Sequence, residues 1–422
     1  MENPSRPLII CNAKVLTPFR SLDHGAVIAK EGVLTYVGPQ SKVSFPKKAC
    51  VIDAQGLYVA PGFIDIHVHG GGGGDTLDAS LSSFRKITVT HAAGGTTSLL
   101  LTTLTAPLSQ IKDTLEMVEI VRSTELKGAK VLGVHLEGPY INPDYAGAQN
   151  PEFVREPRKE EYLPILKSYP CIRRVTFAPE LPGGLELARE LKNRGIVASI
   201  GHSGASYREV LAAIEAGCAH VTHMFSAMSG IRRVKGYRIA GLIESTLLLD
   251  ELTTELIADG HHLPPSLLKL VVKVKGFDKI SLVTDAMAAT GLGPGNYTLG
   301  GLKVLVDGDM PEEFEQVPAI NSYVAKVENR SSFAGSVATM NQLVYNMVHL
   351  ADVPLLDAVK MATVNPARVL GVHDIGVLRS GTKADVVLFN ENFTIMMTIV
   401  EGRIVYQNSE FQPGSRNLLL ET

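Results

Sequence analysis

The feature that most constrains this chain is a long central alternation of short apolar segments with amphipathic ones. The amphipathic segments repeat their apolar residues every three to four positions, as helices with one buried face do. One such segment ends at Gly195, and another begins at Ser206 and ends at Gly217. The apolar segments between them have the length of strands, and they cover residues 63–68, 98–103, 131–136, 175–178, 196–200, 220–223, 254–258 and 280–284.

Eight strands with intervening helices are the repeat of a (β/α)8 TIM barrel. A doubly wound parallel sheet is the rival architecture. It would normally carry a GxGxxG turn after its first strand, and the segment after residue 68 does not contain one. We therefore expect the α/β class and a barrel.

Both ends of the chain have a different pattern, in which short β-branched segments are separated by turn residues. At the start these segments are 8–10, 26–29, 33–37 and 57–60, and at the end they are 386–389 and a hairpin over 398–406. We expect the two ends to form one small composite β-sandwich domain around the barrel. The predicted division is 1–60 for the first part of that domain, 61–369 for the hydrolase barrel and 370–422 for the second part.

Composition narrows the classes of function. The 422 residues carry a net charge of -3, so there is no broad basic field for nucleic acid, and any anionic ligand must meet a local cluster. No stretch is long enough to span a membrane, and the apolar run near the N-terminus is too short for a signal peptide. Cys11, Cys50, Cys171 and Cys218 show neither disulfide-framework nor CxxC spacing. We expect a cytoplasmic protein that binds a small molecule.

Polar residues gather where the predicted strands end, which is the face on which barrel active sites form. His67 and His69 alternate along the first strand, so both side chains lie on one face. Such a pair, taken alone, is more often packed in a core than bound to a metal. Glu137 ends the third strand, where an ionised carboxylate is costly unless it is paired or bound to a cation.

Three further residues stand at the same predicted rim. His202 follows the fifth strand, His223 ends the sixth and Asp285 follows the eighth, whereas we expect His220 to pack or cap. Each could be structural by itself. Imidazole and carboxylate groups together on one rim suit zinc or a similar transition metal, so the set predicts a divalent metal centre.

Longer motifs carry a resemblance to a known family. The motifs are PGFIDIHVHG, HLEGPYINP, GHSGAS, THMFSAM, IADGHHL, LVTDAM and FAGS, with GTKADVVLF near the end. With these motifs the chain resembles the amidohydrolase superfamily and, within it, the N-acetylglucosamine-6-phosphate deacetylase family. The resemblance covers essentially the whole chain, and HLEGP followed by GHS is specific to this branch. Dihydroorotase-like relatives bridge two metals with a carboxylated lysine, and Glu137 takes the ligand role here.

The resemblance implies a ligand set. Glu137, His202 and His223 correspond to the main metal ligands, and His67 and His69 to a second metal position that only some members fill. The expected cofactor is one or two divalent ions per chain, zinc with iron as the alternative.

The resemblance also implies that Asp285 is the catalytic acid and base. A bound metal lowers the pKa of water from 15.7 to roughly 7, and Asp285 would take the proton and pass it to the departing nitrogen. The implied reaction is hydrolysis of N-acetylglucosamine 6-phosphate to glucosamine 6-phosphate and acetate. Deacetylation of N-acetylgalactosamine 6-phosphate or another N-acyl amine stays open. A non-enzymatic scaffold is disfavoured because the ligand set is retained.

The residues that we expect to contact the substrate differ from the family pattern. Gln149 stands where many members have histidine, and Ser226 where asparagine is common. A basic loop, 232–238, stands where the family has an arginine that contacts phosphate, sometimes from the neighbouring subunit. Either the glutamine or the loop could instead be a solvated surface. The predicted substrate contacts are Ala148, Gln149, Ser226, Ala227, Arg233, Arg238, His262, Phe333, Ala334 and Gly335.

Four cations of this loop are candidates for the phosphate, namely Arg232, Arg233, Lys235 and Arg238. The resemblance also implies a homodimer or homotetramer. Residues 307–330 read as an acidic, loop-like elaboration with no role that the sequence assigns.

Overall fold

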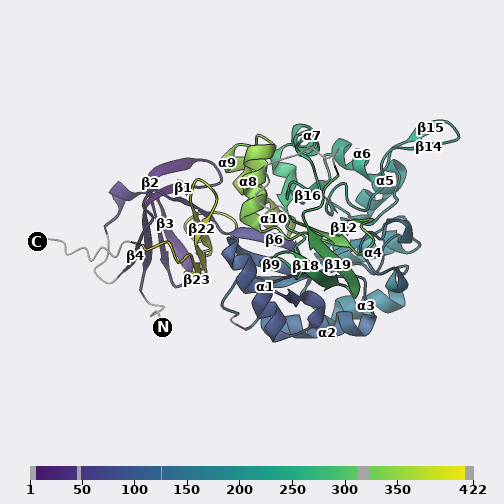
Figure 1. The fold of residues 1–422 in the computed structure, drawn as a ribbon, viewed down its shortest axis with the longest axis horizontal. Coiled ribbons are helices and arrows are strands. Elements are labelled where there is room, and N and C mark those ends of the chain that lie inside the picture. Colours follow the sequence, from purple (N-terminus) through teal and green to yellow (C-terminus); the bar gives the residue numbers. More distant parts are fainter. Residues whose placement is uncertain (1–5, 45–48, 125, 312–322, 414–422) are drawn as a thin grey trace, which may run out of the picture.

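Two large sheets organise the molecule, one inside the barrel and one made from the two ends of the chain (Figure 1). The computed structural model describes residues 6–44, 49–124, 126–311 and 323–413. The barrel strands are β6 (Phe63–Val68), β9 (Thr96–Thr103), β10 (Lys130–Glu137), β11 (Ile172–Phe177), β12 (Val197–Ile200), β13 (His220–Val221), β16 (Thr253–Leu256) and β17 (Ile280–Leu282).

These eight strands are parallel and pair in the order β17-β16-β13-β12-β11-β10-β9-β6. The segment that follows β17 lies beside β6 and is hydrogen-bonded to its end. The N–H of Asp285 donates to the carbonyl of His67 at 3.0 Å, and the N–H of His69 donates to the carbonyl of Ala286 at 2.9 Å. The sheet is thereby nearly closed, which confirms the predicted (β/α)8 barrel. Closure also sets the first and last strands side by side at the mouth.

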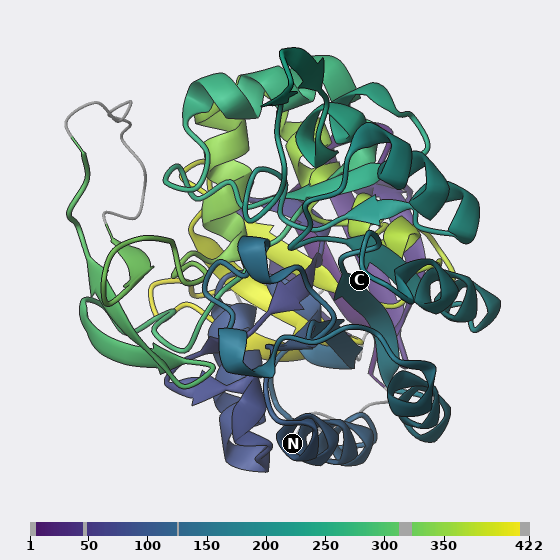
Figure 2. The same ribbon diagram turned by 90° about the vertical axis from the view of Figure 1, so that its right-hand side faces the viewer.

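Helices surround the barrel (Figure 2), as expected for parallel strands that are apolar on both faces. The predicted helix that begins at Ser206 is α5, where Ser206 and Glu209 form a capping box and Gly217 follows the last turn. The helices are α1 (Leu81–Ala93), α2 (Leu108–Val121), α3 (Lys159–Ser168), α4 (Gly184–Asn193), α5 (Tyr207–Ala216), α6 (Leu242–Leu248), α7 (Pro265–Lys275), α8 (Met340–Leu350), α9 (Leu355–Met361) and α10 (Val364–Val369). Short 3₁₀ turns cover Gln40–Lys42, Thr76–Asp78, Pro143–Tyr145, Pro151–Phe153 and Phe277–Lys279.

The second sheet joins the two ends of the chain, as predicted. β21 pairs antiparallel with β5, so a strand from beyond residue 380 lies beside one from before residue 65. The sheet encloses its own apolar core, separate from that of the barrel. The domain boundaries at 60/61 and 369/370 stay a prediction. The strands are β1 (Leu8–Leu16), β2 (Ser21–Lys30), β3 (Val33–Pro39), β4 (Cys50–Asp53), β5 (Tyr58–Pro61), β21 (Val386–Phe389), β22 (Ile395–Val400) and β23 (Arg403–Gln407).

Several local predictions need correction. The seventh and eighth barrel strands end at Leu256 and Leu282, earlier than the expected 258 and 284. The sixth barrel strand ends at Val221 rather than at His223, because the backbone turns into the left-handed region at His223, with φ of 27°. The segment 307–330 is not all loop, since Asp307 ends β19 (Leu302–Asp307) and Val324–Val327 forms β20. Together with β18 (Gly295–Leu299) these strands make a small sheet, and part of the elaboration, 312–322, lies outside the described residues.

The remaining strands are short pairs, β7 (Gly70–Gly71) with β8 (Gly74–Asp75) and β14 (Arg232–Val234) with β15 (Tyr237–Ile239). Among the helices of the described residues, none has the length and apolar character needed to cross a bilayer.

Candidate metal centre and active site

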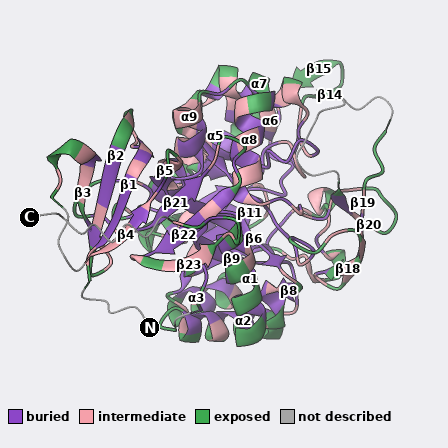
Figure 3. Ribbon diagram, turned by 60° about the vertical axis from the view of Figure 1, so that its left-hand side comes forward, coloured by how far each residue is buried: buried purple, intermediate pink, exposed green. Residues whose placement is uncertain are grey.

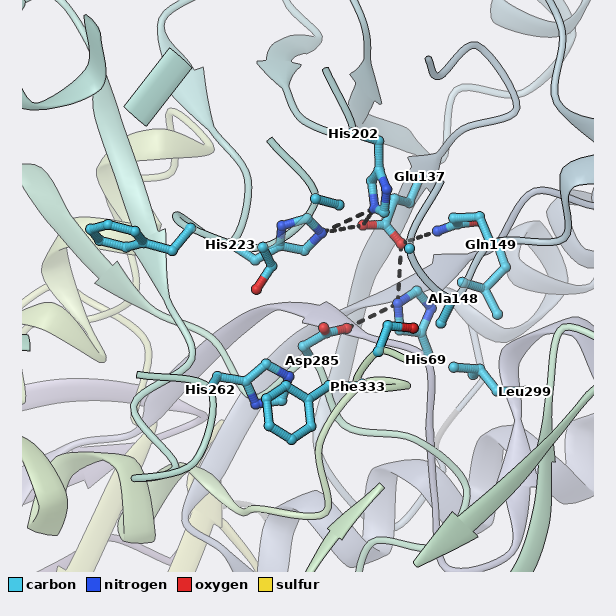
Figure 4. Close-up of a pocket in the computed structure, with 17 residues that line it drawn as sticks. His69, Glu137, Ala148, Gln149, His202, His223, His262, Asp285, Leu299 and Phe333 are labelled. Carbon is cyan, nitrogen blue, oxygen red and sulfur yellow. Dashed lines mark hydrogen bonds and ion pairs between the residues drawn. The ribbon is translucent and has the colours of Figure 1, made fainter. Parts of the chain in front are cut away.

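A pocket of about 300 Å³ opens at the carboxyl ends of the barrel strands (Figure 4). Its floor brings together predicted ligands that lie far apart in the sequence. The residues that line it are His69, Leu104, Glu137, Gly147, Ala148, Gln149, His202, His223, Phe225, Ser226, Ala227, His262, Asp285, Leu299, Ser332, Phe333 and Gly335.

Glu137, His202 and His223 form the first cluster on this floor. Glu137 Oε1 lies 2.9 Å from His223 Nε2 and 3.2 Å from His202 Nε2, and the two Nε2 atoms are 3.2 Å apart. All three side chains are buried. The Nδ1–H of His202 donates to the carbonyl of Tyr145 at 2.9 Å, which leaves Nε2 free to act as a ligand. The three donor atoms can therefore contact one ion.

His67, His69 and Asp285 form the second cluster, directly beside the first. Their donor atoms are close: the two Nε2 atoms lie 3.2 Å apart, and Asp285 Oδ1 is 3.0 Å from His69 Nε2 and 3.3 Å from that of His67. The Nδ1–H of His69 donates to the carbonyl of Thr102 at 3.2 Å. Glu137 Oε2 is 3.3 Å from His69 Nε2, so this carboxylate lies between the two clusters.

The buried carboxylates on the floor favour a positive charge beside them. Burial alone would lower the pKa of His67 and His69, but Asp285 and Glu137 outweigh it and raise these pKa values to about 10 and about 9. Burial would raise the pKa of Glu137, and His67 instead holds it well below its usual range. A divalent cation bound between these side chains would take the place of the positive charge on protonated His67 and His69. The donor set is made of imidazole nitrogen and carboxylate oxygen, which suits zinc, so the residues fit a metal.

Gln149 is not a surface amide, because its side chain is buried against the first cluster. Its Nε2 donates to Glu137 Oε2 at 2.7 Å, and its Oε1 accepts from the N–H of Thr105 at 2.6 Å. The glutamine thus fixes the orientation of the Glu137 carboxylate as well as lining the pocket.

The other predicted substrate contacts divide into two groups. Those that line the pocket are Ala148, Ser226, Ala227, His262, Phe333 and Gly335, whereas Ala334 is fully buried and is not among the lining residues. The Nδ1–H of His262 donates to Asp259 Oδ2 at 2.8 Å, and its ring lies 4.4 Å from that of Phe333. These two rings form one wall of the pocket (Figure 4).

Arg233 and Arg238 lie elsewhere. They face each other across the β14–β15 hairpin, which projects from the barrel and is exposed (Figures 1 and 3). Neither lines the pocket of its own chain, and none of the described residues that do line it is a lysine or an arginine. Within the described chain these two arginines lie outside the pocket, and their contact with the phosphate stays a prediction.

Sequence reasoning missed part of the apolar wall. Leu104 follows β9, Phe225 follows the turn at His223, and Leu299 ends β18 of the small sheet. The THMFSAM motif contains Phe225, so the sequence offered a signal there, whereas no motif marks Leu104 or Leu299. Only the three-dimensional path of the loops identifies them.

Comparisons with known proteins agree with the fold and show the family. The amidohydrolase family model matches residues 58–405. The chain is 33% identical to N-acetylglucosamine-6-phosphate deacetylase of Bacillus subtilis (strain 168), over 96% of this chain and 98% of that protein. It is also 33% identical to N-acetylgalactosamine-6-phosphate deacetylase of Escherichia coli O157:H7, over 93% and 97%.

Solved structures give the same result. A mutant N-acetyl-D-glucosamine-6-phosphate deacetylase from Mycobacterium smegmatis, in complex with N-acetyl-D-glucosamine-6-phosphate, is 32% identical with a TM-score of 0.84, covering 96% of this chain and 100% of that one. The chain is therefore a hydrolase of the amidohydrolase family. Within that family it belongs with the N-acetylglucosamine-6-phosphate deacetylases.

Proposed function

We propose that this enzyme hydrolyses N-acetylglucosamine 6-phosphate to glucosamine 6-phosphate and acetate. The observation that carries the proposal is the meeting of Glu137, His202 and His223 beside Asp285 on the floor of one buried pocket. The full-length similarity to deacetylases of this substrate supports it.

Glu137, His202 and His223 would hold a divalent cation, and His67 and His69 with Asp285 a second one. Zinc is the cation that the donor set favours, with iron as the alternative. When bound, the cation supplies an acidified water and positive charge for the oxyanion that develops in amide hydrolysis.

Asp285 would serve as general base and then as general acid. Burial raises the pKa of its carboxyl, but His67 and His69 lower it below its usual value, so the group is ionised and can accept a proton. It would return that proton to the sugar nitrogen, because an amide nitrogen does not leave as an anion. Its backbone N–H donates to the carbonyl of His67 at 3.0 Å, which holds the backbone of Asp285 beside the second cluster.

The phosphate would be bound by Arg233 and Arg238 of a second copy of the chain. A phosphate binds most strongly to the fork of an arginine, and the described lining of a single pocket offers no such group. The hairpin that carries both arginines also exposes Tyr237 at 77% and Ile231 at 66%, which is typical of a surface that another protein covers. We propose a homodimer, or a homotetramer built from it.

Two broader predictions go with this function. We propose that the enzyme acts in the cytoplasm, since its four cysteines lack the spacing of a disulfide framework. We also propose the division of the chain at 60/61 and 369/370, which the pairing of β5 with β21 supports.

The second candidate substrate is N-acetylgalactosamine 6-phosphate, since a deacetylase of that sugar is as similar in identity as the first relative. An acetate-release assay with both phosphorylated sugars and with unphosphorylated N-acetylglucosamine tests the proposal. We expect the glucosamine form to be the preferred substrate. Preference for N-acetylgalactosamine 6-phosphate would show that this isomer is the substrate instead. Equal rates with and without phosphate would overturn the proposed role of the arginines.

A further inference from the structure

A buried ion pair lies inside the barrel, beneath the floor of the pocket. Arg174 on β11 and Glu255 on β16 are both completely buried, and an Arg174 Nη1 contacts Glu255 Oε1 directly. Neither residue lines the pocket. Burial of such a pair costs several kcal/mol per ion, and replacement by apolar residues is often neutral or stabilising. Stability alone therefore does not account for charges at these positions.

Arg174 anchors the pair to the surrounding strands. Its Nη1 donates to the carbonyl of Ile66 at 3.3 Å, and its Nη2 donates to Ser199 Oγ at 3.1 Å and to Thr222 Oγ1 at 2.8 Å. Two of these contacts fall next to predicted ligands, since Ile66 precedes His67 and Thr222 precedes His223. The guanidinium is thus tied to the strand ends that carry both clusters.

Glu255 contacts the predicted ligands directly. Its Oε2 accepts the backbone N–H of His223 at 3.1 Å, and its backbone carbonyl accepts the N–H of Met224 at 3.0 Å. The Nδ1–H of His67 donates a hydrogen bond to the same Oε2 at 3.5 Å, which leaves Nε2 of His67 directed toward His69 and Asp285. One carboxylate oxygen therefore contacts a member of each cluster.

The backbone contact matters because His223 has an unusual conformation. Its φ of 27° lies in the left-handed region, which a residue other than glycine adopts only at a cost. Two successive N–H groups bonded to Glu255 hold this turn. Loss of the Glu255 carboxylate would remove the bond to the N–H of His223 and the acceptor described for Nδ1 of His67, while the bond from Met224 to the backbone carbonyl would stay.

We propose that Glu255, held in place by Arg174, is a positioning residue that orients His223 and His67 for metal binding. The proposal rests on the proposed metal-dependent function. It predicts that a hydrogen-bond acceptor at position 255 is needed for full metal affinity and that the barrel folds without it.

The test compares two double variants with the wild-type enzyme. In R174M/E255L both charges and the acceptor are removed, while the volume is kept. In R174M/E255Q the charges are removed, but an amide oxygen can still accept from His223 and His67. Both avoid leaving one buried charge without its partner. The readouts are the affinity for zinc, by competition with a chelating indicator, and the cooperative thermal unfolding of each protein.

We expect both variants to unfold cooperatively. Zinc affinity should fall by about 10- to 100-fold in R174M/E255L, the range typical of lost partners of metal ligands, and should be largely restored in R174M/E255Q. Wild-type zinc affinity in R174M/E255L would overturn the proposal. Failure of both variants to fold would also contradict it, because the pair would then determine the fold. A wild-type protein that binds no zinc would instead overturn the proposed function itself.

Discussion

The floor of the pocket and the hairpin beside it are built in different ways. Glu137 and His223 on the floor are buried, stand at the ends of barrel strands and are held by further hydrogen bonds. Arg233 and Arg238 are exposed on a two-stranded hairpin outside the barrel. The difference teaches that the described residues of one chain bring the hydrolytic groups together, whereas no lysine or arginine is among those that line the pocket. Substitutions on the floor and on the hairpin should therefore have separable effects.

The largest effect is expected from D285N. Loss of a general acid–base group typically costs about 10²- to 10⁴-fold in rate, and asparagine keeps the shape of the side chain. We expect kcat to fall by that factor with phosphorylated and unphosphorylated sugar alike, while zinc stays bound at Glu137, His202 and His223. Acetate release and metal analysis on the same sample measure both. Substantial residual turnover would remove Asp285 from its proposed role.

The double variant R233A/R238A should act on the phosphorylated substrate alone. Hydrogen bonds to a charged group contribute about 1.5–3 kcal/mol, which corresponds to a rise in KM of about 10- to 100-fold. The KM for the unphosphorylated sugar should not change. R189A, on the exposed face of α4, is the matched control. An equal rise in KM with both sugars would show that substitutions on the floor and on the hairpin do not have separable effects.

F333A should have a smaller effect that does not depend on phosphate. The ring of Phe333 lies 4.4 Å from that of His262, and such contacts contribute about 0.5–1.5 kcal/mol. We expect kcat/KM to fall by about 2- to 10-fold with either sugar. F19A, which changes a residue that is 91% exposed, is the control. A change confined to the phosphorylated substrate would show that this wall contributes to phosphate recognition.

A variant in the terminal sheet should affect stability and leave turnover unchanged. Burial raises the pKa of Asp385 from 3.8 to about 6, so the folded protein favours the protonated carboxyl. Its contribution to stability is then fully present below about pH 4 and is lost as the pH rises through about 6. A pKa difference of this size corresponds to about 3 kcal/mol of unfolding free energy.

In D385N this pH dependence should be absent. Urea unfolding of both proteins between about pH 4 and pH 7 measures it, and the wild type should lose more unfolding free energy than the variant across that range. Parallel curves for the two proteins would contradict the assignment.

The sequence was sufficient for the barrel and for the residues that gather on its floor. Strand-length apolar segments with polar ends indicate which face of a parallel barrel those ends share, and the structure brings Glu137, His202, His223 and Asp285 together there. The sequence alone could not predict contacts between strands that are not neighbours in the sheet. Arg174 meets Glu255 across the barrel interior, and only the register of the closed sheet reveals it. A signal existed, because each is a charge inside an otherwise buried strand.

The position of Gln149 illustrates another limit. The sequence marks it as a departure from the family pattern, but its contact with Glu137 depends on how the loop after β10 folds back over the strand end. The arginines of the hairpin illustrate a third limit, since their proposed contact is with a second copy of the chain, which the sequence does not specify.

Removal and return of the metal tests the central claim most directly. After treatment with a chelator and its removal, the protein should release no acetate from N-acetylglucosamine 6-phosphate. Titration with zinc should restore the rate in proportion to the zinc bound, up to one or two ions per chain. A protein shown by metal analysis to contain no divalent ion, yet releasing acetate at the full rate, would contradict the account.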